Sequence, residues 1–506
     1  MLMSSDALLL AIDQGTTSSR AILFDANLQA LATAQMELAQ SFPRPGWVEH
    51  DPDTIWQDCV TCCRQVLSQV EGSAERVAGL GITNQRETIV LWERRSGRAL
   101  HPALVWQDRR TTEICAGKRA AGLEAEIRQR TGLLLDPYFS ATKLCWLLDN
   151  IEGARAAADA GDLAAGTIDT WLLWHLTGGE VFATEVSNAA RTSLFNIHTL
   201  QWDPWLLQQF DIPLELLPEV RDTCADFGTT RVDLFGRAIP IAALVGDQQS
   251  ATIGQACFAP GSMKCTFGTG AFAMQNTGAQ CMVQNEDLLT TVLWRHQGNC
   301  DYALEGSIFS AGSAIQWLRD GLGILSNAAQ SAALAGAADP HARIYLIPAF
   351  TGLGAPWWDP NARASLHGLT RGTGRAEIVR AALEAACFQT RDLLESARAN
   401  GALLPDCLRV DGGMTANAWM LQFLADILDL PIVRPKLTEI TAAGAASCAA
   451  LQLGMVADTA ELAAKWQADQ VVKPIMTAAE REQRYQGWRD AVGRTLSRPN
   501  RHGSDT

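Results

Sequence analysis

The feature that most restricts the fold of this chain is a pair of short turns rich in threonine and glycine, half a chain apart. The first is DQGTTSSR at residues 13–20, and the second is FGTGAF at residues 267–272. Apolar runs typical of β-strands flank both turns, at residues 8–12, 21–24, 262–266 and 273–275. Glycine lets the backbone approach an anion closely, and the hydroxyl and N–H groups can donate to it. The two turns together predict a two-lobed nucleotide enzyme that holds a polyphosphate from both sides.

Length and composition define the broad class of protein. A chain of 506 residues is too long for a single core, so two or more domains are expected. An apolar fraction of 47% and a charged fraction of 19% are typical of a globular protein. A net charge of −14 argues against a nucleic-acid partner or an anionic membrane surface, but it permits a local basic pocket.

The two turns suggest an internal duplication of architecture without a repeat of sequence. We predict an N-terminal domain over residues 1–250 and a C-terminal domain over residues 251–495, because FAPG at residues 258–261 interrupts the pattern. The polar segment 496–506 is expected to be a disordered tail.

Local patterns predict the main helices and strands. A helix over residues 54–70 follows an N-cap aspartate, Asp51, and a proline at its first position, Pro52. Further helices are expected at residues 112–130, 140–150, 169–177, 308–322 and 375–399. Further strands are expected at residues 77–83, 88–93 and 408–410.

The cysteines indicate a reducing compartment. There are 13, an odd number, and they are scattered through a large chain without a spacing that suggests zinc. We therefore expect reduced, mostly buried thiols in a cytoplasmic protein. No run reaches ~18 apolar residues, so no integral membrane segment is expected, and the N-terminal apolar run is too short for a signal peptide.

Asp13 and the segment 408–417 are the first candidate functional groups. Asp13 ends an apolar strand beside the expected phosphates, where a Mg²⁺ ion held through water would relieve the repulsion. The alternative is an aspartate that only caps the turn. Gly412 and Gly413 permit close backbone approach, and Asn417 is suited either to capping the next helix or to contacting an adenine or ribose.

Several motifs together resemble one enzyme family, the FGGY carbohydrate kinases. They are residues 13–20, 81–87 (GITNQRE), 246–249 (GDQQ), 267–272 and 410–413 (VDGG). Residues 45–52 (PGWVEHDP) and 350–358 (FTGLGAPWW) resemble the branch of that family that phosphorylates glycerol. Two FGGY signatures also look intact, one over residues 139–150 and one ending near Glu384. The resemblance spans residues 8–490 and implies the α/β actin-like ATPase fold, with two ribonuclease-H-like domains and a catalytic cleft between them.

The resemblance implies ATP-dependent phosphorylation of glycerol to sn-glycerol 3-phosphate. The residues that it places around glycerol are Arg86, Glu87, Trp106, Tyr138, Asp247, Gln248 and Phe272. A triol needs paired donors and acceptors plus an apolar wall, which these residue types supply. Without the resemblance, Arg86 and Glu87 would be a surface ion pair, and Trp106 and Phe272 would be core aromatics.

Asp247 is the implied catalytic residue. A primary alcohol is a poor nucleophile at neutral pH, so a carboxylate must accept its proton as the phosphoryl group transfers. On its own, an aspartate before Gln248 could equally be the N-cap of a helix.

The resemblance also implies the nucleotide site and the assembly. The residues that it places around ATP or ADP are Thr16, Thr17, Ser18, Arg20, Thr269, Gly312, Gln316, Gly413 and Asn417. Mg²⁺ is implied at Asp13 through water, and a homodimer or homotetramer is implied for the assembly. Residues 233–237 (DLFGR) keep one arginine of a family loop for fructose 1,6-bisphosphate but lose its small residues, so that inhibition is not expected.

Two other functions remain open at this point. One is an FGGY kinase for a ketose such as xylulose or ribulose, although Tyr138 beside Arg86, Glu87 and Trp106 favours the shorter triol. The other is a nucleotide-driven binding protein like actin or a chaperone ATPase, against which Asp247 argues because such proteins lack a metabolite acceptor.

Overall fold

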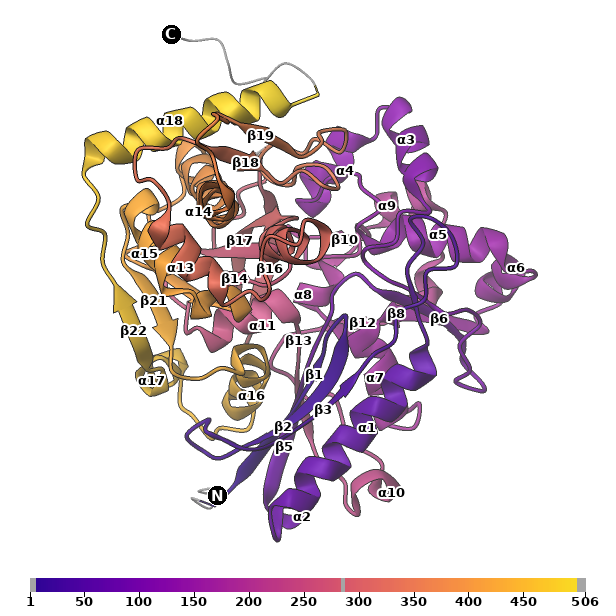
Figure 1. Ribbon diagram of the computed structural model, residues 1–506. Coiled ribbons are helices and arrows are strands. Elements are labelled where there is room, and N and C mark those ends of the chain that lie inside the picture. Colours follow the sequence, from indigo (N-terminus) through magenta and orange to yellow (C-terminus); the bar gives the residue numbers. More distant parts are fainter. Residues whose placement is uncertain (1–5, 284–286, 498–506) are drawn as a thin grey trace.

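The first Thr/Gly turn joins two neighbouring strands of a five-stranded mixed sheet (Figure 1). The computed structural model describes residues 6–283 and 287–497. In spatial order, the strands of this N-terminal sheet are β13 (Ile241–Gly246), β5 (Val77–Asn84), β1 (Leu8–Gln14), β2 (Ser18–Phe24) and β3 (Ala30–Glu37). Strand β5 runs parallel to both β1 and β13. The carboxyl ends of these three strands therefore meet at one edge of the sheet.

The second Thr/Gly turn joins two strands of a seven-stranded C-terminal sheet. In spatial order, its strands are β16 (Leu289–His296), β17 (Asn299–Ile308), β15 (Ala271–Gly278), β14 (Met263–Phe267), β20 (Leu408–Asp411), β21 (Ile432–Pro435) and β22 (Ala468–Val472). Strand β20 lies parallel to β14, as β5 lies parallel to β1. A hairpin beside a parallel strand thus occurs in both sheets, which confirms the predicted duplication of architecture.

Smaller sheets decorate the two halves. A four-stranded sheet consists of β4 (Glu49–His50), β7 (Ala103–Leu104), β6 (Ile89–Glu93) and β8 (Leu163–Thr167). The two-stranded sheets pair β10 (Phe195–Asn196) with β11 (Gln201–Trp202), β12 (Glu219–Arg221) with β9 (Ala183–Glu185), and β18 (Tyr345–Ile347) with β19 (Ser365–His367). The predicted strands at residues 77–83, 88–93 and 408–410 are confirmed.

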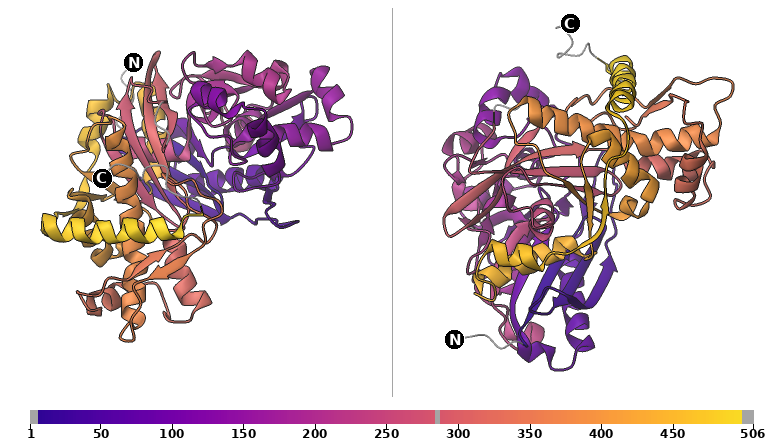
Figure 2. Two further views of the ribbon diagram at one scale, coloured as in Figure 1. Left: turned by 90° about the horizontal axis from the view of Figure 1, so that it is seen from above. Right: turned by 90° about the vertical axis from the view of Figure 1, so that its left-hand side faces the viewer.

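Helices cover both sheets. Up to residue 254 they are α1 (Pro52–Gln69), α2 (Ser73–Arg76), α3 (Thr112–Ala120), α4 (Glu124–Thr131), α5 (Ser140–Asn150), α6 (Ala154–Asp159), α7 (Ile168–Leu176), α8 (Val186–Ala189), α9 (Pro204–Phe210), α10 (Val232–Phe235) and α11 (Asp247–Gly254). After it they are α12 (Gly312–Gln316), α13 (Gln330–Ala337), α14 (Arg375–Ala399), α15 (Ala418–Leu428), α16 (Ile440–Gln452), α17 (Thr459–Lys465) and α18 (Ala478–Thr495). Figure 2 shows the two halves side by side, with α18 along the outside of the second.

Strand β1 is buried on both faces, as its continuous apolar run predicts. Leu8, Leu10 and Ile12 pack into the core that contains α1, while Leu9 and Ala11 pack into the core that contains α16. This alternation is the two-residue period of a strand. Helix α16 comes from the C-terminal part of the chain, so the core of the N-terminal sheet is completed by residues far away in sequence.

Glycines allow α16 to cross β5 and α11 at very short distance. A Cβ on Gly444 of α16 would lie 1.9 Å from the Ser250 carbonyl oxygen, and one on Gly254 of α11 would lie 2.1 Å from the Ile440 oxygen. A Cβ on Gly81 of β5 would lie 2.3 Å from the oxygen of Ala445. Real Cβ atoms do not approach backbone oxygens so closely, so this crossing requires glycine at each position.

Two predicted helices need correction, while those at residues 54–70, 140–150, 169–177 and 375–399 are confirmed. The segment 112–130 is split into α3 and α4 because Gly122 adopts a φ of 77°. Strand β17 continues to Ile308, so the helix predicted at residues 308–322 begins only at Gly312 and continues as a π-helix, η2 (Trp317–Gly321). Short 3₁₀ turns are η1 (Leu214–Leu216) and η3 (Gly413–Ala416).

The remaining sequence expectations concern thiols, membrane spans and the tail. All 13 cysteines are free, including Cys59 and Cys62, which form a Cys-x-x-Cys spacing within α1. Across residues 6–283 and 287–497, no helix combines the length and apolarity that crossing a bilayer requires. Of the predicted tail, residues 498–506 lie outside the described residues, and Ser497 N donates to Asp359 Oδ2 at 2.7 Å.

Candidate active site

The ends of three parallel strands bring charged side chains to one edge of the N-terminal sheet. Asp13 is the penultimate residue of β1, Arg86 and Glu87 follow β5, and Asp247 follows β13 and begins α11. Their proximity follows from the sheet, because carboxyl ends of adjacent parallel strands share an edge. The topology therefore brings together residues that are more than 200 positions apart in sequence.

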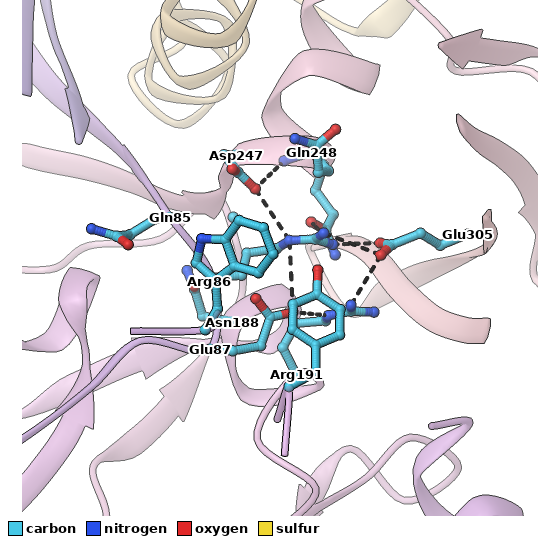
Figure 3. A network of polar contacts seen from close by, with 12 residues as sticks. Gln85, Arg86, Glu87, Asn188, Arg191, Asp247, Gln248 and Glu305 are labelled. Atoms are coloured by element: carbon cyan, nitrogen blue, oxygen red, sulfur yellow. Dashed lines mark hydrogen bonds and ion pairs between the residues drawn. The ribbon is translucent and has the colours of Figure 1, made fainter. Parts of the chain in front are cut away.

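Arg86 lies at the centre of a buried polar network (Figure 3). Its Nε is 3.1 Å from Asp247 Oδ1, and its Nη1 and Nη2 are 2.5 and 3.1 Å from the two carboxylate oxygens of Glu305. Nη1 also donates to Gln249 Oε1 at 3.2 Å. Arg86 and Glu87 are only 3% and 2% exposed, so the alternative of a surface ion pair is wrong.

A second buried arginine completes this network. Arg191 donates from Nε to Glu87 Oε1 at 2.6 Å and from Nη2 to Glu305 Oε1 at 2.9 Å. Burial alone raises the pKa of Glu305, but Arg191 and Arg86 outweigh it and lower that pKa to about 2. Burial also raises the pKa of Glu87, against the opposing effect of both arginines. Glu305 is therefore the firmly ionised carboxylate of the network.

Three half-buried aromatic side chains stand beside the charged network. The ring centroids of Trp106 and Tyr138 are 5.4 Å apart, and those of Trp106 and Phe272 are 6.3 Å apart at an angle of 80°. Phe272 belongs to β15 of the C-terminal sheet, whereas the other two come from the N-terminal half. Half-buried rings that meet across the two halves differ from ordinary core aromatics, and they form an apolar wall.

Asp247 is the first helical residue of α11, and Gly246 is the N-cap, so the alternative of Asp247 as an N-cap is wrong. Oδ1 of Asp247 accepts from Gln248 N at 2.7 Å and lies 3.1 Å from Arg86 Nε. The side chain is 29% exposed, unlike the buried arginine. The Asp247 side chain thus lies at the positive end of the α11 dipole.

Lys264 of β14 is a buried cation next to Gln248. Its Nζ donates to Gln248 Oε1 at 2.5 Å and to Thr266 Oγ1 at 3.1 Å. Burial lowers the pKa of Lys264, while Asp411 and Asp247 oppose that effect. The lysine therefore links Gln248, which was predicted to bind glycerol, to the C-terminal sheet.

The first Thr/Gly turn is a tight hairpin with one exposed threonine at its tip. Gly15 N donates to Ser18 O at 2.9 Å, which leaves Thr17 exposed at the tip. Thr16 Oγ1 accepts from Trp106 Nε1 at 2.9 Å, so this turn touches the aromatic wall. Arg20 of β2 is 3.1 Å from Glu439, just before α16.

Asp13 carries a perturbed carboxyl group beside this turn. Burial raises its pKa to about 7, Asp247 and Glu439 add to the increase, and Arg20 opposes it. Asp13 and Arg20 are direct partners across β1 and β2. A carboxyl group with such a pKa is a functional-site candidate, because burial and like charges have been placed around it.

The second Thr/Gly turn meets two other backbone segments. Ala311 N and Ser313 N both donate to Thr269 O at 3.0 Å, and Gly312 N donates to Gly268 O at 3.0 Å. A Cβ on Gly312 would lie 3.5 Å from Met414 Sδ. Residues 268–270, 311–313 and 412–414 therefore lie together, as a nucleotide site built from backbone would require.

The other predicted nucleotide residues lie around this junction. Gln316 ends α12 and is exposed, and Gly413 is exposed at the start of η3. Asn417 is the N-cap of α15: its Oδ1 accepts from Met420 N at 3.0 Å. Its Nδ2 donates to Ser331 Oγ at 3.0 Å. Of the two roles considered for Asn417, the structure contains the capping one.

Sequence patterns missed three residues of this region: Arg191, Glu305 and Lys264. Glu305 and Lys264 each stand as a single charge inside an apolar strand, YALEGSI and MKCTF. A lone charge in a buried strand requires a partner, and that signal was available. Arg191 lies between α8 and β10, where no local pattern distinguishes it.

Two lobes that each present a Thr/Gly turn, with a helix-terminal aspartate between them, define a two-lobed kinase of the actin-like ATPase fold. The chain belongs to the FGGY family of carbohydrate kinases, whose N-terminal domain matches residues 8–254 and whose C-terminal domain matches residues 263–453. The predicted family and fold class are both confirmed.

Individual relatives agree over almost the whole chain. The sequence is 56% identical to a glycerol kinase of Rhodospirillum centenum over 489 residues, which is 97% of this chain and 98% of that protein. It is 55% identical to a glycerol kinase of Ectopseudomonas mendocina, over 97% and 99% of the two chains. The solved structure of Plasmodium falciparum glycerol kinase with ADP superposes with a TM-score of 0.92 at 35% identity, covering 97% and 99%. A xylulose kinase from Rhodospirillum rubrum has a TM-score of 0.86 at 23% identity, covering 96% and 98%, and shows the shared fold alone.

Proposed function

We propose that this protein phosphorylates glycerol with ATP, giving sn-glycerol 3-phosphate and ADP. Relatives named glycerol kinase match almost the full chain at 52–56% identity. The observation that carries the proposal is the buried Arg86–Glu87 pair beside an aromatic wall, with Asp247 at its partly exposed rim. This combination suits a small polyol, which needs hydrogen bonds to its hydroxyls and apolar contact for its carbons.

We assign Arg86, Glu87, Trp106, Tyr138, Asp247, Gln248 and Phe272 to glycerol. Burial raises the pKa of Tyr138, so its phenol stays neutral and can donate a hydrogen bond. The charged groups would form the stronger bonds to hydroxyls, while Trp106 and Phe272 would cover the carbon chain. Because Phe272 comes from the C-terminal sheet, closing the two halves would complete the glycerol site.

Asp247 is the proposed general base. Both of its contacts fall on Oδ1, which leaves Oδ2 to accept the proton of a glycerol hydroxyl. As that oxygen bonds to the γ-phosphorus of ATP, its proton passes to Asp247. The bond from the γ-phosphorus to the β–γ bridging oxygen breaks, and ADP leaves.

The proposed nucleotide site combines the two Thr/Gly turns with the three-segment junction. The assigned residues are Thr16, Thr17, Ser18, Arg20, Thr269, Gly312, Gln316, Gly413 and Asn417. The exposed hydroxyls of Thr17 and Thr269 and the exposed backbone of Gly413 suit phosphate oxygens. Asn417 keeps its side chain in the helix cap, so its contribution would come from its remaining exposed surface.

Asp13 is the proposed residue for Mg²⁺, acting through water. Within residues 6–283 and 287–497, no cluster of three His, Cys, Asp or Glu side chains could hold a metal by itself. A single partly exposed carboxylate fits Mg²⁺, which usually keeps several waters and also binds the substrate phosphates. Bound Mg²⁺ would supply charge neutralisation at the transferring phosphoryl group.

We also propose a division of the chain into two domains and an oligomeric assembly. The predicted boundary between domains 1–250 and 251–495 falls inside α11, so this helix would connect the two domains. A homodimer or homotetramer in the cytoplasm, without inhibition by fructose 1,6-bisphosphate, is the expected state. Sedimentation would measure the assembly, and initial rates with and without the bisphosphate would measure the inhibition.

A coupled assay for ADP release tests the proposed activity. Glycerol, dihydroxyacetone, xylulose and ribulose would each be titrated at saturating Mg²⁺–ATP. We expect the highest kcat/KM with glycerol. Turnover with a pentulose alone would identify a ketose kinase, and ATP hydrolysis independent of all four acceptors would point to a nucleotide-driven binding protein. Either outcome would refute the proposal.

A further inference from the structure

Glu305 belongs to the C-terminal sheet, but its carboxylate binds two arginines of the N-terminal half (Figure 3). Arg86 approaches both of its oxygens, and Arg191 Nη2 lies 2.9 Å from Oε1. All three side chains are buried, at 3% exposure or less. One carboxylate therefore joins the two halves at the place where the glycerol residues meet.

The strand register shows that Glu305 faces the proposed acceptor site. In the antiparallel pair of β15 and β17, Phe272 is opposite Ser307 and Met274 is opposite Glu305. Residues two apart on a strand, and direct partners across strands, project from the same face of a sheet. Phe272 and Glu305 therefore share one face, so the strand face that supplies the aromatic wall also supplies this carboxylate.

Strand β17 also leads directly to the second Thr/Gly turn. Ile308 is opposite Ala271, and a Cβ on Gly270 would lie 2.5 Å from the Ile308 oxygen. The strand is followed by Gly312, one of the proposed nucleotide residues. Glu305 thus lies on a strand whose end adjoins the second Thr/Gly turn and precedes Gly312.

Four of the five N–H groups of Arg86 already have a hydrogen-bond or ion-pair partner within the protein. A guanidinium has five N–H groups in one plane. Nε faces Asp247, Nη1 faces Glu305 and Gln249, and Nη2 faces Glu305. These contacts use four groups and leave one N–H on Nη2. The direction of that remaining donor is set by the two bonds to Glu305, because the group is planar and rigid.

We propose that Glu305 is a positioning residue for glycerol: it orients the Arg86 guanidinium and locks Arg191 against Glu87 when the two halves meet. This inference rests on the proposed function, since it assumes that Arg86 and Glu87 bind glycerol. The carboxylate acts through the arginines and does not itself touch the acceptor. Glu305 thereby fixes the angle between the Arg86 N–H donor and the Glu87 carboxylate. That angle determines which glycerol hydroxyl faces Asp247.

A purely structural role explains poorly why Glu305 is buried as a charge between two arginines. Taking charges out of water is expensive, and buried ion pairs often add nothing compared with apolar residues of similar volume. A structural role predicts a loss of stability alone. A positioning role also predicts a selective loss of affinity for glycerol, because the Arg86 donor would rotate.

Steady-state kinetics of Glu305→Gln on the full chain tests the proposal. The substitution keeps the shape but removes the charge that holds both guanidinium groups. We expect the glycerol KM to rise ~10- to ~100-fold, the range expected for lost hydrogen bonds to charged groups, while the ATP KM changes less than about twofold. Glu305→Asp keeps the charge but shortens the reach, and it should give a smaller rise in glycerol KM.

Glu384→Gln is the matched control. Glu384 is also a buried carboxylate with two arginines, 3.4 Å from Arg380 and 3.3 Å from Arg484, but it lies on α14 and outside the acceptor site. Burial raises the pKa of Glu384 to about 7, so this control matches the pairing with two arginines rather than the full charge of Glu305. It should leave the glycerol KM unchanged. An equal rise in the KM values of glycerol and ATP for Glu305→Gln, or no rise, would overturn the positioning role.

The two hypotheses fail in different ways. If wild-type protein shows no turnover that depends on glycerol, the proposed function fails. If the wild type phosphorylates glycerol and the Glu305 variants keep its KM, only the positioning role fails. Should Glu305→Gln not fold, Glu305→Asp decides alone, and a wild-type glycerol KM in that variant refutes the proposal.

Discussion

The proposed glycerol site and the proposed nucleotide site differ in the kind of groups that form them and in how buried those groups are. Around glycerol, long charged side chains such as Arg86 and Glu305 are buried and bind each other across the two halves. Around the nucleotide, short hydroxyls and backbone groups lie exposed on tight turns, as Thr17 and Thr269 do. The first site is held by its own ion pairs, whereas the second relies on the shape of the chain.

This difference separates the expected effects of substitution. Removing one charge from the buried network leaves its partner desolvated and uncompensated, which is costly. Removing one exposed hydroxyl forfeits a single hydrogen bond, and water can replace it. Substitutions at the acceptor side should therefore have larger effects than those at the turns.

The largest effect is expected for Asp247→Asn. An amide cannot accept the hydroxyl proton, so kcat should fall by ~10²- to ~10⁴-fold, the usual contribution of a general base. The Kd for ATP should stay within about twofold, because the substitution leaves the turns intact. Stopped-flow or coupled kinetics with glycerol, together with ATP titration calorimetry, would measure both.

Asp203→Asn is the control for that experiment. Asp203 caps α9 and pairs with Arg130 at 3.0 Å, away from the proposed site. It should lower stability without changing kcat. A kcat for Asp247→Asn close to wild type would remove Asp247 from the role of base.

Arg86→Ala should have the next largest effect. It removes a charged donor and leaves Glu305 with one arginine, so the glycerol KM should rise ~10- to ~100-fold. The ATP KM should change less, since the hydrogen bonds and close ion pairs of Arg86 are to Asp247, Gln249 and Glu305. Initial rates over a matrix of glycerol and ATP concentrations would separate the two constants, and equal rises would contradict the division between the sites.

Asp13, beside the first Thr/Gly turn of the proposed nucleotide site, should make the free energy of unfolding depend on pH. Its pKa is raised by burial from 3.8 to about 7, so the folded protein binds a proton that the unfolded chain has released over that interval. The contribution of Asp13 to stability is present below about pH 4 and is lost as the pH rises towards about 7. In EDTA, the free energy of unfolding of the wild type should therefore fall relative to Asp13→Asn across this range.

Chemical denaturation of both proteins at several pH values would measure that difference. Parallel curves for wild type and Asp13→Asn would show that Asp13 titrates normally. With Mg²⁺ present, the free energies of unfolding of wild type and Asp13→Asn should also differ, because the asparagine variant lacks the carboxylate that we assign to the cation.

The smallest effect is expected for Thr269→Ala. The lost hydroxyl is exposed and neutral, so the ATP KM should rise only ~2- to ~10-fold while the glycerol KM is unchanged. Thr199→Ala, an exposed threonine in the turn between β10 and β11, is the matched control. An effect as large as that of Arg86→Ala would show that the turns depend on individual side chains after all.

The sequence was most informative where structure is local. Asp51 and Pro52 predict the start of α1, and glycine between apolar runs predicts both hairpins, because caps and turns depend on a few neighbouring residues. The split between α3 and α4 was missed, since Gly122 stands in an otherwise helical pattern. The early start predicted for α12 failed because the apolar pattern at residues 308–322 does not show where β17 ends.

The charged network could not be predicted from local patterns. Arg191 and Glu305 are 114 positions apart and come from different halves, so only the assembled fold brings them to 2.9 Å. The family resemblance supplied Arg86, Glu87 and Asp247 as individual residues. It did not supply their supporting partners, because those act through geometry that no single motif records.

The glycine crossing of α16 with β5 and α11 has a consequence for which substitutions this protein can tolerate. Every missense change at Gly81, Gly254 or Gly444 adds at least a Cβ, which would lie 2.3, 2.1 or 1.9 Å from a backbone oxygen. Backbone cannot retreat as a flexible side chain can, so no replacement residue is small enough. We therefore expect any substitution at these three positions to push the backbones of α16, β5 and α11 apart and to destabilise the protein far more than substitutions at exposed positions.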